Sequence, residues 1–320
     1  MRPMAKSLGG FRAALVAGWV ALSVAGIFFA RAKGIPVGAA LPVVAAFLVE
    51  YPFYLVAGFP TVRERLASPR LPAILTVAVV LPYLLCCAGA IHFEWDALVR
   101  LAALALALGL WYRVLHVSAW TDIGFLLLIA GVLLGRYFDP IYPEFYRQKL
   151  AMVGQLSLFQ ISVLVLILER RIPETGYGFL PSAAEWRAGV LHYLYFLPLG
   201  GGLALALGMV HVSPHARLWL LPVTFLAFLW VQGLWEEFLF RGVLQQWLEA
   251  WTASPLVALA LSSLVFGAAH FWFRGFPNWR WAVVATVLGV LCGRARNYTG
   301  GIRAGTVTHA LVVATWRAFF

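Results

Sequence analysis

The sequence has few charged residues and almost no cysteine. Asp, Glu, Lys and Arg make up 12% of its 320 residues, whereas a soluble domain carries about 25%. This excludes a soluble globular enzyme, and it also excludes a disordered chain, which needs high charge and low hydrophobicity. The three cysteines, Cys86, Cys87 and Cys292, form no CxxC pair and lie in apolar runs. Core packing is therefore favoured over a metal or disulfide role.

Several signatures of enzymes and of nucleic-acid-binding proteins are also missing. The sequence contains no GxSxG, HExxH, Walker A or GxGxxG motif. It contains no motif for RNA or DNA binding either, although its formal net charge is +11. The basic residues lie in short loops at the ends of apolar runs, which is typical of membrane topology and of contacts with lipid headgroups.

Apolar residues dominate what is present, at 62% of the chain. Runs such as 13–30 and 151–168 contain no charge and are about long enough to cross a bilayer. No alternating ten-residue pattern occurs, so helices are favoured over barrel strands. We predict an all-α fold, a polytopic membrane helix bundle with about 10–11 transmembrane helices. The predicted spans are 13–30, 37–59, 73–91, 98–115, 123–137, 150–168, 190–210, 218–238, 255–273, 281–293 and 304–319.

The loops indicate an orientation and a division of the chain. With the N-terminus inside, three arginine clusters fall on the inner side, as the positive-inside rule favours. These clusters are Arg63/Arg65/Arg70, Arg170/Arg171/Arg187 and Arg294/Arg296/Arg303. The longest loop, 169–189, is polar. We therefore expect N-terminal transmembrane helices of unassigned role over 1–189. We expect residues 190–320 to form a core that contains the candidate catalytic residues.

Two carboxylates and an arginine stand out in the back half. Glu236, Glu237 and Arg241 lie at the predicted end of an apolar helix. One charge at mid-bilayer costs about 2.5–3.5 kcal/mol on insertion scales, so such residues are functional candidates. Glu237 and Arg241 are i,i+4 neighbours and can pair. Glu236 points roughly 100° away from Glu237, and is thereby left to face a cavity.

Two histidines complete a set that can do chemistry. His270 follows Phe266 by one turn and is predicted to lie inside another apolar helix, and His309 lies in the last span. A glutamate can take a proton from water, and histidines can orient that water or stabilise an oxyanion. The same three residues could instead hold Zn²⁺ as a His₂Glu site. The residue types alone leave both chemistries open.

These motifs resemble a known family. The stretch Glu236-Glu237-x-x-x-Arg241-Gly242, then Phe266-x-x-x-His270, then His309 in the final helix is similar to the CPBP family. Its members are the CAAX-processing and bacteriocin-processing (Abi) intramembrane endopeptidases. The resemblance covers about residues 215–320. It implies a glutamic-type protease without a metal cofactor, in which Glu236 activates water, His270 orients it and His309 stabilises the oxyanion. Glu237, Arg241 and Phe266 would be supporting residues.

One position departs from the family. Its last motif usually has asparagine four residues after the histidine, where this chain has Val313. Valine cannot donate a hydrogen bond, and losing one oxyanion donor costs about 10²–10³ in rate. Either another donor replaces it or the chain is not a full protease. The candidate substitutes are Gln232, Asn297, Thr306 and Trp316.

The resemblance also implies a substrate and a location. We expect cleavage of a peptide bond near the end of a membrane-anchored protein, in the bacterial inner (cytoplasmic) membrane. The chain end, from His309 to Val313 followed by Trp316-Arg317, is similar to a branch linked to bacterial C-terminal sorting signals. The expected partners are the substrate protein or peptide and the bilayer, with no nucleic acid. Two alternatives stay open: a zinc-dependent hydrolase using the same residues, and a non-catalytic membrane scaffold or immunity protein, which Val313 favours.

Overall fold

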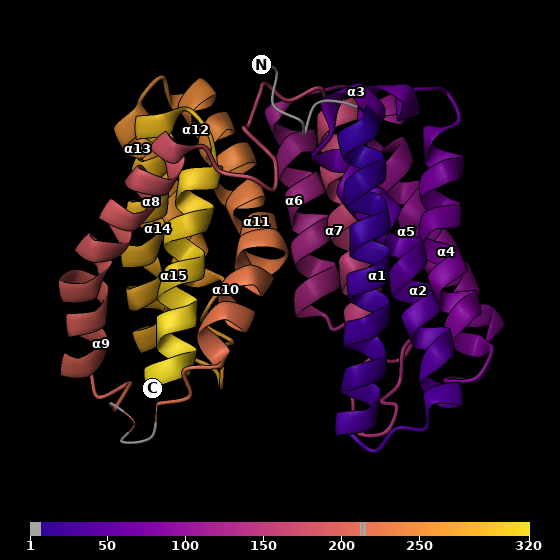
Figure 1. Ribbon diagram of the computed structural model, residues 1–320. Coiled ribbons are helices and arrows are strands. Elements are labelled where there is room, and N and C mark those ends of the chain that lie inside the picture. The colour runs from indigo at the N-terminus through magenta and orange to yellow at the C-terminus, as the bar shows by residue number, and fades with distance from the viewer. Residues whose placement is uncertain (1–7, 212, 214–215) are drawn as a thin grey trace. The chain divides into compact units, whose positions relative to one another are not determined.

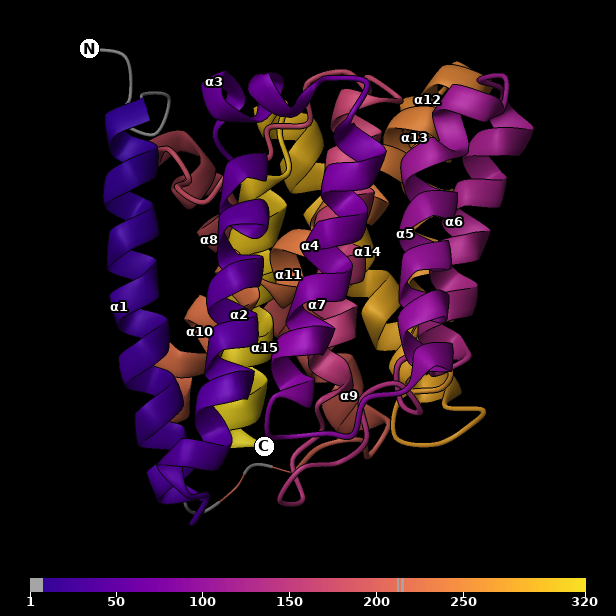
Figure 2. The ribbon, with the colours of Figure 1, turned by 90° about the vertical axis from the view of Figure 1, so that its right-hand side faces the viewer.

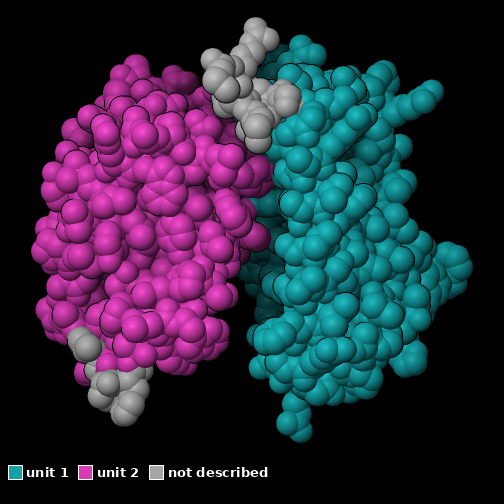
Figure 3. All heavy atoms as spheres, in the orientation of Figure 1, with its two compact units in different colours: residues 1–172 teal, residues 173–320 magenta. Residues whose placement is uncertain are grey.

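The computed structural model describes residues 8–211, 213 and 216–320. Within these residues the regular secondary structure is entirely helical (Figure 1). This confirms the all-α bundle, and each of the eleven predicted spans overlaps a helix. Contacts divide the chain into two compact units, residues 1–172 and 173–320, coloured separately in Figure 3. The functional division at 189/190 stays a prediction.

The first unit is built around one central helix. Helix α7 packs against α2, α4, α5 and α6. It contains no charged residue and is buried along most of its length, as a helix that is apolar on all sides requires. Figure 2 shows α1, α2, α4 and α5 side by side. The helices are α1 (Leu8–Ala32), α2 (Val37–Ala57), α3 (Pro60–Arg63), the short 3₁₀ turn η2 (Glu64–Leu66), α4 (Leu71–Cys87), α5 (Trp95–Val114), α6 (Ala119–Leu134) and α7 (Ala151–Leu168).

The second unit is arranged around the last helix. Helix α15 packs against α8, α10, α11 and α14, and α13 packs against α14. Two of its helical runs contain π-helical turns, η3 and η4. The elements are α8 (Ala183–Phe196), η3 (Leu197–Gly201), α9 (Gly202–Ala206), α10 (Leu220–Trp230), α11 (Gln232–Glu237), η4 (Phe238–Leu244), α12 (Gln245–Thr252), α13 (Pro255–Ala268), α14 (Trp279–Thr299) and α15 (Arg303–Phe319).

Six helical stretches among the described residues are long and apolar enough to cross a membrane. A seventh is added if the bent pair 60–66 and 71–87 forms one span. The remaining predicted spans correspond to shorter or more polar helices. Helices α6 and α13 have 16 and 14 residues, and α14 carries Arg280, Arg294 and Arg296.

Of two local predictions, one is confirmed and the other is wrong. Helix α11, which carries Glu236 and Glu237, ends at Glu237 as predicted, although helical backbone continues through η4 and α12 to Thr252. Pairing of Glu237 with Arg241 removes the isolated buried charge that would oppose such a continuation. His270 does not lie inside a helix, since α13 ends at Ala268 and His270 occupies the turn that follows. The apolar pattern runs on past the helix end because the loop itself is rich in aromatic residues.

Candidate active site

The two carboxylates occupy the last residues of α11, where the helix changes its hydrogen-bonding pattern. Val231 breaks the run with φ −125° and ψ −85°, and the π-helical turn η4 follows immediately. Such turns are frequent at functional sites. Within η4, Arg241 Nε lies 3.4 Å from Glu237 Oε2, and both side chains are fully buried. The predicted i,i+4 pair therefore forms inside the bundle.

His309 lies between the two carboxylates. Its Nδ1 is 2.9 Å from Glu237 Oε1, a hydrogen-bonding distance. Its Nε2 is 3.7 Å from Glu236 Oε2, which is too long for a direct bond. Because Glu237 is paired with Arg241 as a carboxylate, Nδ1–H of His309 donates to it. The hydrogen bond fixes the ring so that Nε2 faces Glu236.

The two carboxylates differ in access. Glu237 is fully buried, whereas the Glu236 side chain is 19% exposed. Gln232, one turn earlier, donates from Nε2 to Glu236 Oε1 at 2.6 Å. Glu236 is thus the acid with room for a further ligand beside it. Its remaining oxygen faces the Nε2 edge of His309, across a gap that a third polar atom can bridge.

The Phe266 ring is the common neighbour of the site. The Arg241 guanidinium lies over it at 4.4 Å from the ring centroid. The His309 ring meets it edge-on at 5.8 Å between centroids, and the His270 ring lies at 4.8 Å. A cation over an aromatic face is stabilised electrostatically. Phe266 therefore links the motif of α13 to that of α15 without any polar contact.

His270 is held by its own chain. Its Nδ1 lies 2.8 Å from the Phe266 carbonyl oxygen. A carbonyl can only accept, so Nδ1 carries the proton and Nε2 of the neutral ring is an acceptor. No hydrogen bond joins His270 to Glu236 or His309 among the residues that the structure describes. The Phe266 ring, which contacts both histidines, connects His270 to His309.

Small residues allow the close packing of these helices. A Cβ added at Gly305 would lie 2.9 Å from Glu237 Oε2 and 3.0 Å from the Cys292 carbonyl oxygen. A Cβ at Gly289 would lie 3.1 Å from Ser263 and 3.2 Å from Arg241. Neither glycine was predicted from the sequence to belong to the site. The small-xxx-small spacing of Gly289-x-x-x-Gly293 is typical of membrane helix contacts and could have indicated such a role.

The structure separates the four substitutes for the missing asparagine. Gln232 contacts Glu236, as described above. Asn297 accepts hydrogen bonds from Gln245 and Arg296. Thr306 donates to the Ile302 carbonyl oxygen at the start of its own helix, and the Trp316 ring contacts the Trp281 ring in a tilted arrangement. Of the four, Gln232 is the one in contact with a predicted site residue. Val313 itself is half-buried on α15.

A second buried group has metal-binding chemistry. Ligand atoms of Glu237, Cys292 and His309 all lie within 4.8 Å of one another, and carboxylate, thiolate and imidazole are zinc ligands. This set differs from the predicted His₂Glu set and includes a cysteine that sequence reasoning assigned to packing. Arg241 already places one positive charge against Glu237, which opposes the entry of a cation.

Comparisons with known proteins agree with the motifs. Residues 218–315 match the family model described as type II CAAX prenyl endopeptidase Rce1-like. A segment of 81 residues is 33% identical to the uncharacterized protein YpbD of Bacillus subtilis (strain 168). It covers 25% of this chain and 37% of YpbD, so the chain spans little more than a third of that curated relative. No solved structure matches the chain.

The family match contains all three predicted catalytic residues, Glu236, His270 and His309. It confirms the resemblance of the C-terminal region to the CPBP family. Together with the long apolar helices, it identifies the chain as an integral membrane protein with a CAAX-protease-like region.

Proposed function

Starting from this Rce1-like region, we propose that the protein is an intramembrane endopeptidase in which Glu236 is the general base. The observation that carries the proposal is the asymmetry of the two neighbouring acids. Glu237 is fully buried and bound by Arg241 and His309, whereas Glu236 is partly exposed and faces the free edge of His309. A base must reach the water that it deprotonates, and Glu236 meets this requirement.

The proposed reaction begins with a water molecule beside Glu236. The carboxylate takes one proton from it while the water oxygen bonds to the peptide carbonyl carbon. The carbonyl electron pair moves to oxygen, giving a tetrahedral oxyanion. Collapse restores the carbonyl and breaks the C–N bond, and the proton held by Glu236 passes to the leaving nitrogen. His270, whose Nε2 is an acceptor, orients the attacking water.

His309 would stabilise the oxyanion through Nε2–H. Since its Nδ1–H already donates to Glu237, this role requires protons on both ring nitrogens. Arg241 and His309 then carry two positive charges against the two negative charges of Glu236 and Glu237. A cluster without net charge is the least costly arrangement in a low-dielectric interior. Glu237 and Arg241 are accordingly positioning residues, which hold His309 through its Nδ1.

Gln232 would supply the donor that Val313 cannot. Its amide nitrogen has two hydrogens, and one of them is directed to Glu236. The second is available to an oxyanion formed next to Glu236. The proposed substrate is a membrane-anchored protein cut near its end, in the bacterial inner membrane, with C-terminal sorting signals as the class of tail.

The direct test compares wild type with Glu236→Gln in the native membrane. Glu236→Gln keeps the side-chain size and removes the base, and Glu249→Gln, on α12 of the same helical run, is the matched control. Protein termini of the membrane proteome are compared among the three. One class of tail should accumulate uncut in Glu236→Gln alone. Identical termini in all three strains, with folded and abundant protein, would refute the protease and favour the scaffold or immunity function.

A zinc hydrolase is the second candidate, because Glu237, Cys292 and His309 form a compact ligand set. Zinc there would use residues that the first proposal assigns to positioning and packing. Cys292→Ala separates the two. It removes a zinc ligand and should abolish activity in a zinc enzyme, but it should leave a glutamate-dependent protease active.

A further inference from the structure

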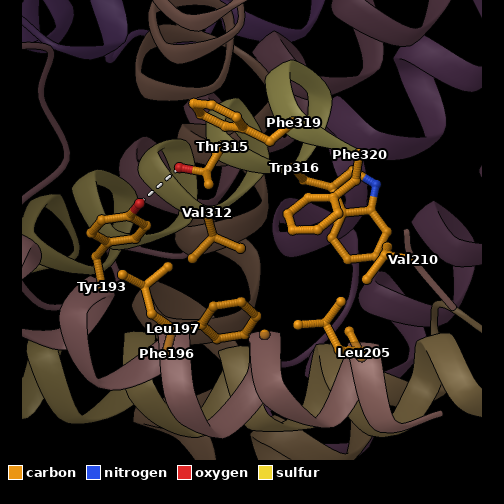
Figure 4. A pocket seen from close by; sticks show the side chains of 12 residues that line it. Tyr193, Phe196, Leu197, Leu205, Val210, Val312, Thr315, Trp316, Phe319 and Phe320 are labelled. Carbon is orange, nitrogen blue, oxygen red and sulfur yellow. Dashed lines mark hydrogen bonds between the residues drawn. The ribbon is translucent and has the colours of Figure 1, made fainter. Parts of the chain in front are cut away.

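The second unit contains an apolar cavity beside the C-terminal half of α15. Its volume is about 360 Å³, within the range of about 300–1,000 Å³ that is usual for ligand pockets. Figure 4 shows Phe196 of α8 and Val312 and Trp316 of α15 turned toward this space. A hydrogen bond of 2.8 Å between Tyr193 and Thr315 lies at its edge. The lining is otherwise apolar.

The cavity lies along the same face of α15 as His309. At about 100° per residue, Val312 and Trp316 fall within roughly 60° of His309 around the helix axis, and both line the cavity. With a rise of about 1.5 Å per residue, Val312 lies ~4.5 Å and Phe319 ~15 Å beyond His309. An extended peptide advances about 3.3–3.6 Å per residue. The cavity therefore matches substrate positions one to four residues from the scissile bond.

We propose that this cavity is a specificity pocket for a large apolar side chain of the substrate, located one to four residues from the bond that is cut. The inference rests on the proposed protease function and names what its substrate carries. At ~30 Å³ per water-sized group, the volume holds roughly a dozen such groups, which is more than one small aliphatic side chain fills. A large aromatic or branched side chain fits this size.

Two adjacent glycines provide a matched pair of variants. Gly201 lines the cavity, and a Cβ there would meet nothing closer than the Phe196 carbonyl oxygen at 3.8 Å. Gly202 is not among the lining residues, and a Cβ there would meet nothing within 4 Å. Both have helical backbone angles. Leucine at 201 therefore fills the cavity, while leucine at 202 makes the same chemical change beside it.

The experiment uses the full-length protein in membranes and a set of membrane-anchored reporters. The reporters differ only in one residue, alanine or a large apolar residue, at each of the four positions on either side of the cut. Wild type should prefer the large residue at one position. Gly201→Ala, Val and Leu should lower that preference stepwise, with the leucine variant changing the kcat/KM ratio at least about tenfold. Gly202→Leu should keep the wild-type preference.

The outcomes separate the pocket from the protease. If Gly201→Leu keeps the wild-type substrate preference, the cavity is not a specificity pocket. If Gly201→Leu lowers the cleavage of all reporters equally, the specificity pocket is also refuted, and a lipid chain occupies the cavity. No cleavage by wild type, or undiminished cleavage by Glu236→Gln, would instead refute the proposed protease, and the pocket with it. The graded series guards against misfolding, because Gly201→Ala adds a single methyl group to open space.

Discussion

At the scale of single residues, burial distinguishes two neighbouring glutamates. Glu237 is enclosed by Arg241 and His309, so its charge is already used in holding other groups. Glu236 keeps one oxygen directed toward a partly open space. In the proposed mechanism, the same side chain one residue apart therefore performs positioning in one case and chemistry in the other.

Glu237→Gln should lower kcat by about 10²–10³, because a neutral amide no longer holds a protonated His309 in place. KM should stay within about twofold, since Glu237 contacts no substrate in the proposed mechanism. A simple loss of folding would reduce the amount of active enzyme, which active-site titration measures. A rise in KM with kcat unchanged would contradict the positioning role.

Gln232→Leu should reduce kcat by a similar factor of about 10²–10³ if it supplies the second oxyanion donor. Asn297→Leu is the suitable comparison, since Asn297 contacts Gln245 and Arg296. It should retain activity close to wild type in the reporter assay. Full activity of Gln232→Leu would exclude it as the replacement for the family asparagine.

Helical periodicity was sufficient to predict the contacts within one helix. It predicted that Glu237 meets Arg241, and the same i,i+4 spacing applies to Gln232 and Glu236. It could not predict that His309 lies between the two acids, because this depends on the register of α15 against α11. Nor could it predict the role of Gly305, which becomes visible only when Glu237 and Cys292 approach it from other helices.

Glu50 in the first unit is a buried acid with an uncharged partner. It is 2% exposed, accepts a hydrogen bond from Ser157, and its second oxygen has no partner. Among the described residues it forms no ion pair. An unpaired charge there would be costly, so we expect Glu50→Gln to be tolerated. Glu50→Lys should lower the thermal stability of the detergent-solubilised protein strongly. Equal destabilisation by both variants would indicate an unrecognised need for the carboxyl group.

At the scale of helices, close approach depends on residues without side chains. Gly305 allows α15 to lie against Glu237 and α14. Gly305→Ala should destabilise the protein by about 1–3 kcal/mol through overpacking and reduce activity. Gly131→Ala in α6 meets nothing within 4 Å and should be neutral or stabilising. Thermal unfolding of both variants measures the difference. Equal changes in thermal stability for the two variants would show that the helix propensity of alanine, rather than packing, determines the change.

The helices themselves were predictable from composition, because runs of apolar residues have few other stable forms in a membrane. Their ends were less predictable. The aromatic loop after α13 continues the apolar pattern into a turn, and the charged residues of α11 interrupt that pattern inside a helical run. In both cases the end of the apolar pattern differs from the end of the helical run.

At the scale of the whole molecule, polar contacts connect loops and helix ends at one end of each unit. In the first unit Arg113 donates to the carbonyl oxygens of Ser68 and Pro69 and pairs with Glu169. In the second unit Arg303 pairs with Glu185, and Arg296 with Glu249. These ends contain the three arginine clusters that the positive-inside rule assigns to the cytoplasm.

Single cysteines can test this orientation. In a chain with Cys86, Cys87 and Cys292 replaced by alanine, Ser68→Cys and Glu249→Cys should react with a membrane-impermeant maleimide only after the cells are opened. His92→Cys and Phe276→Cys should react in intact cells, because α4 and α13 each lead from one end of their unit to the other. Reversed labelling of all four positions would place the N-terminus outside. Labelling of Glu249→Cys and Phe276→Cys from the same side would mean that α13, with only 14 residues, does not cross the membrane. The active site would then open to a single face through the loop that carries His270.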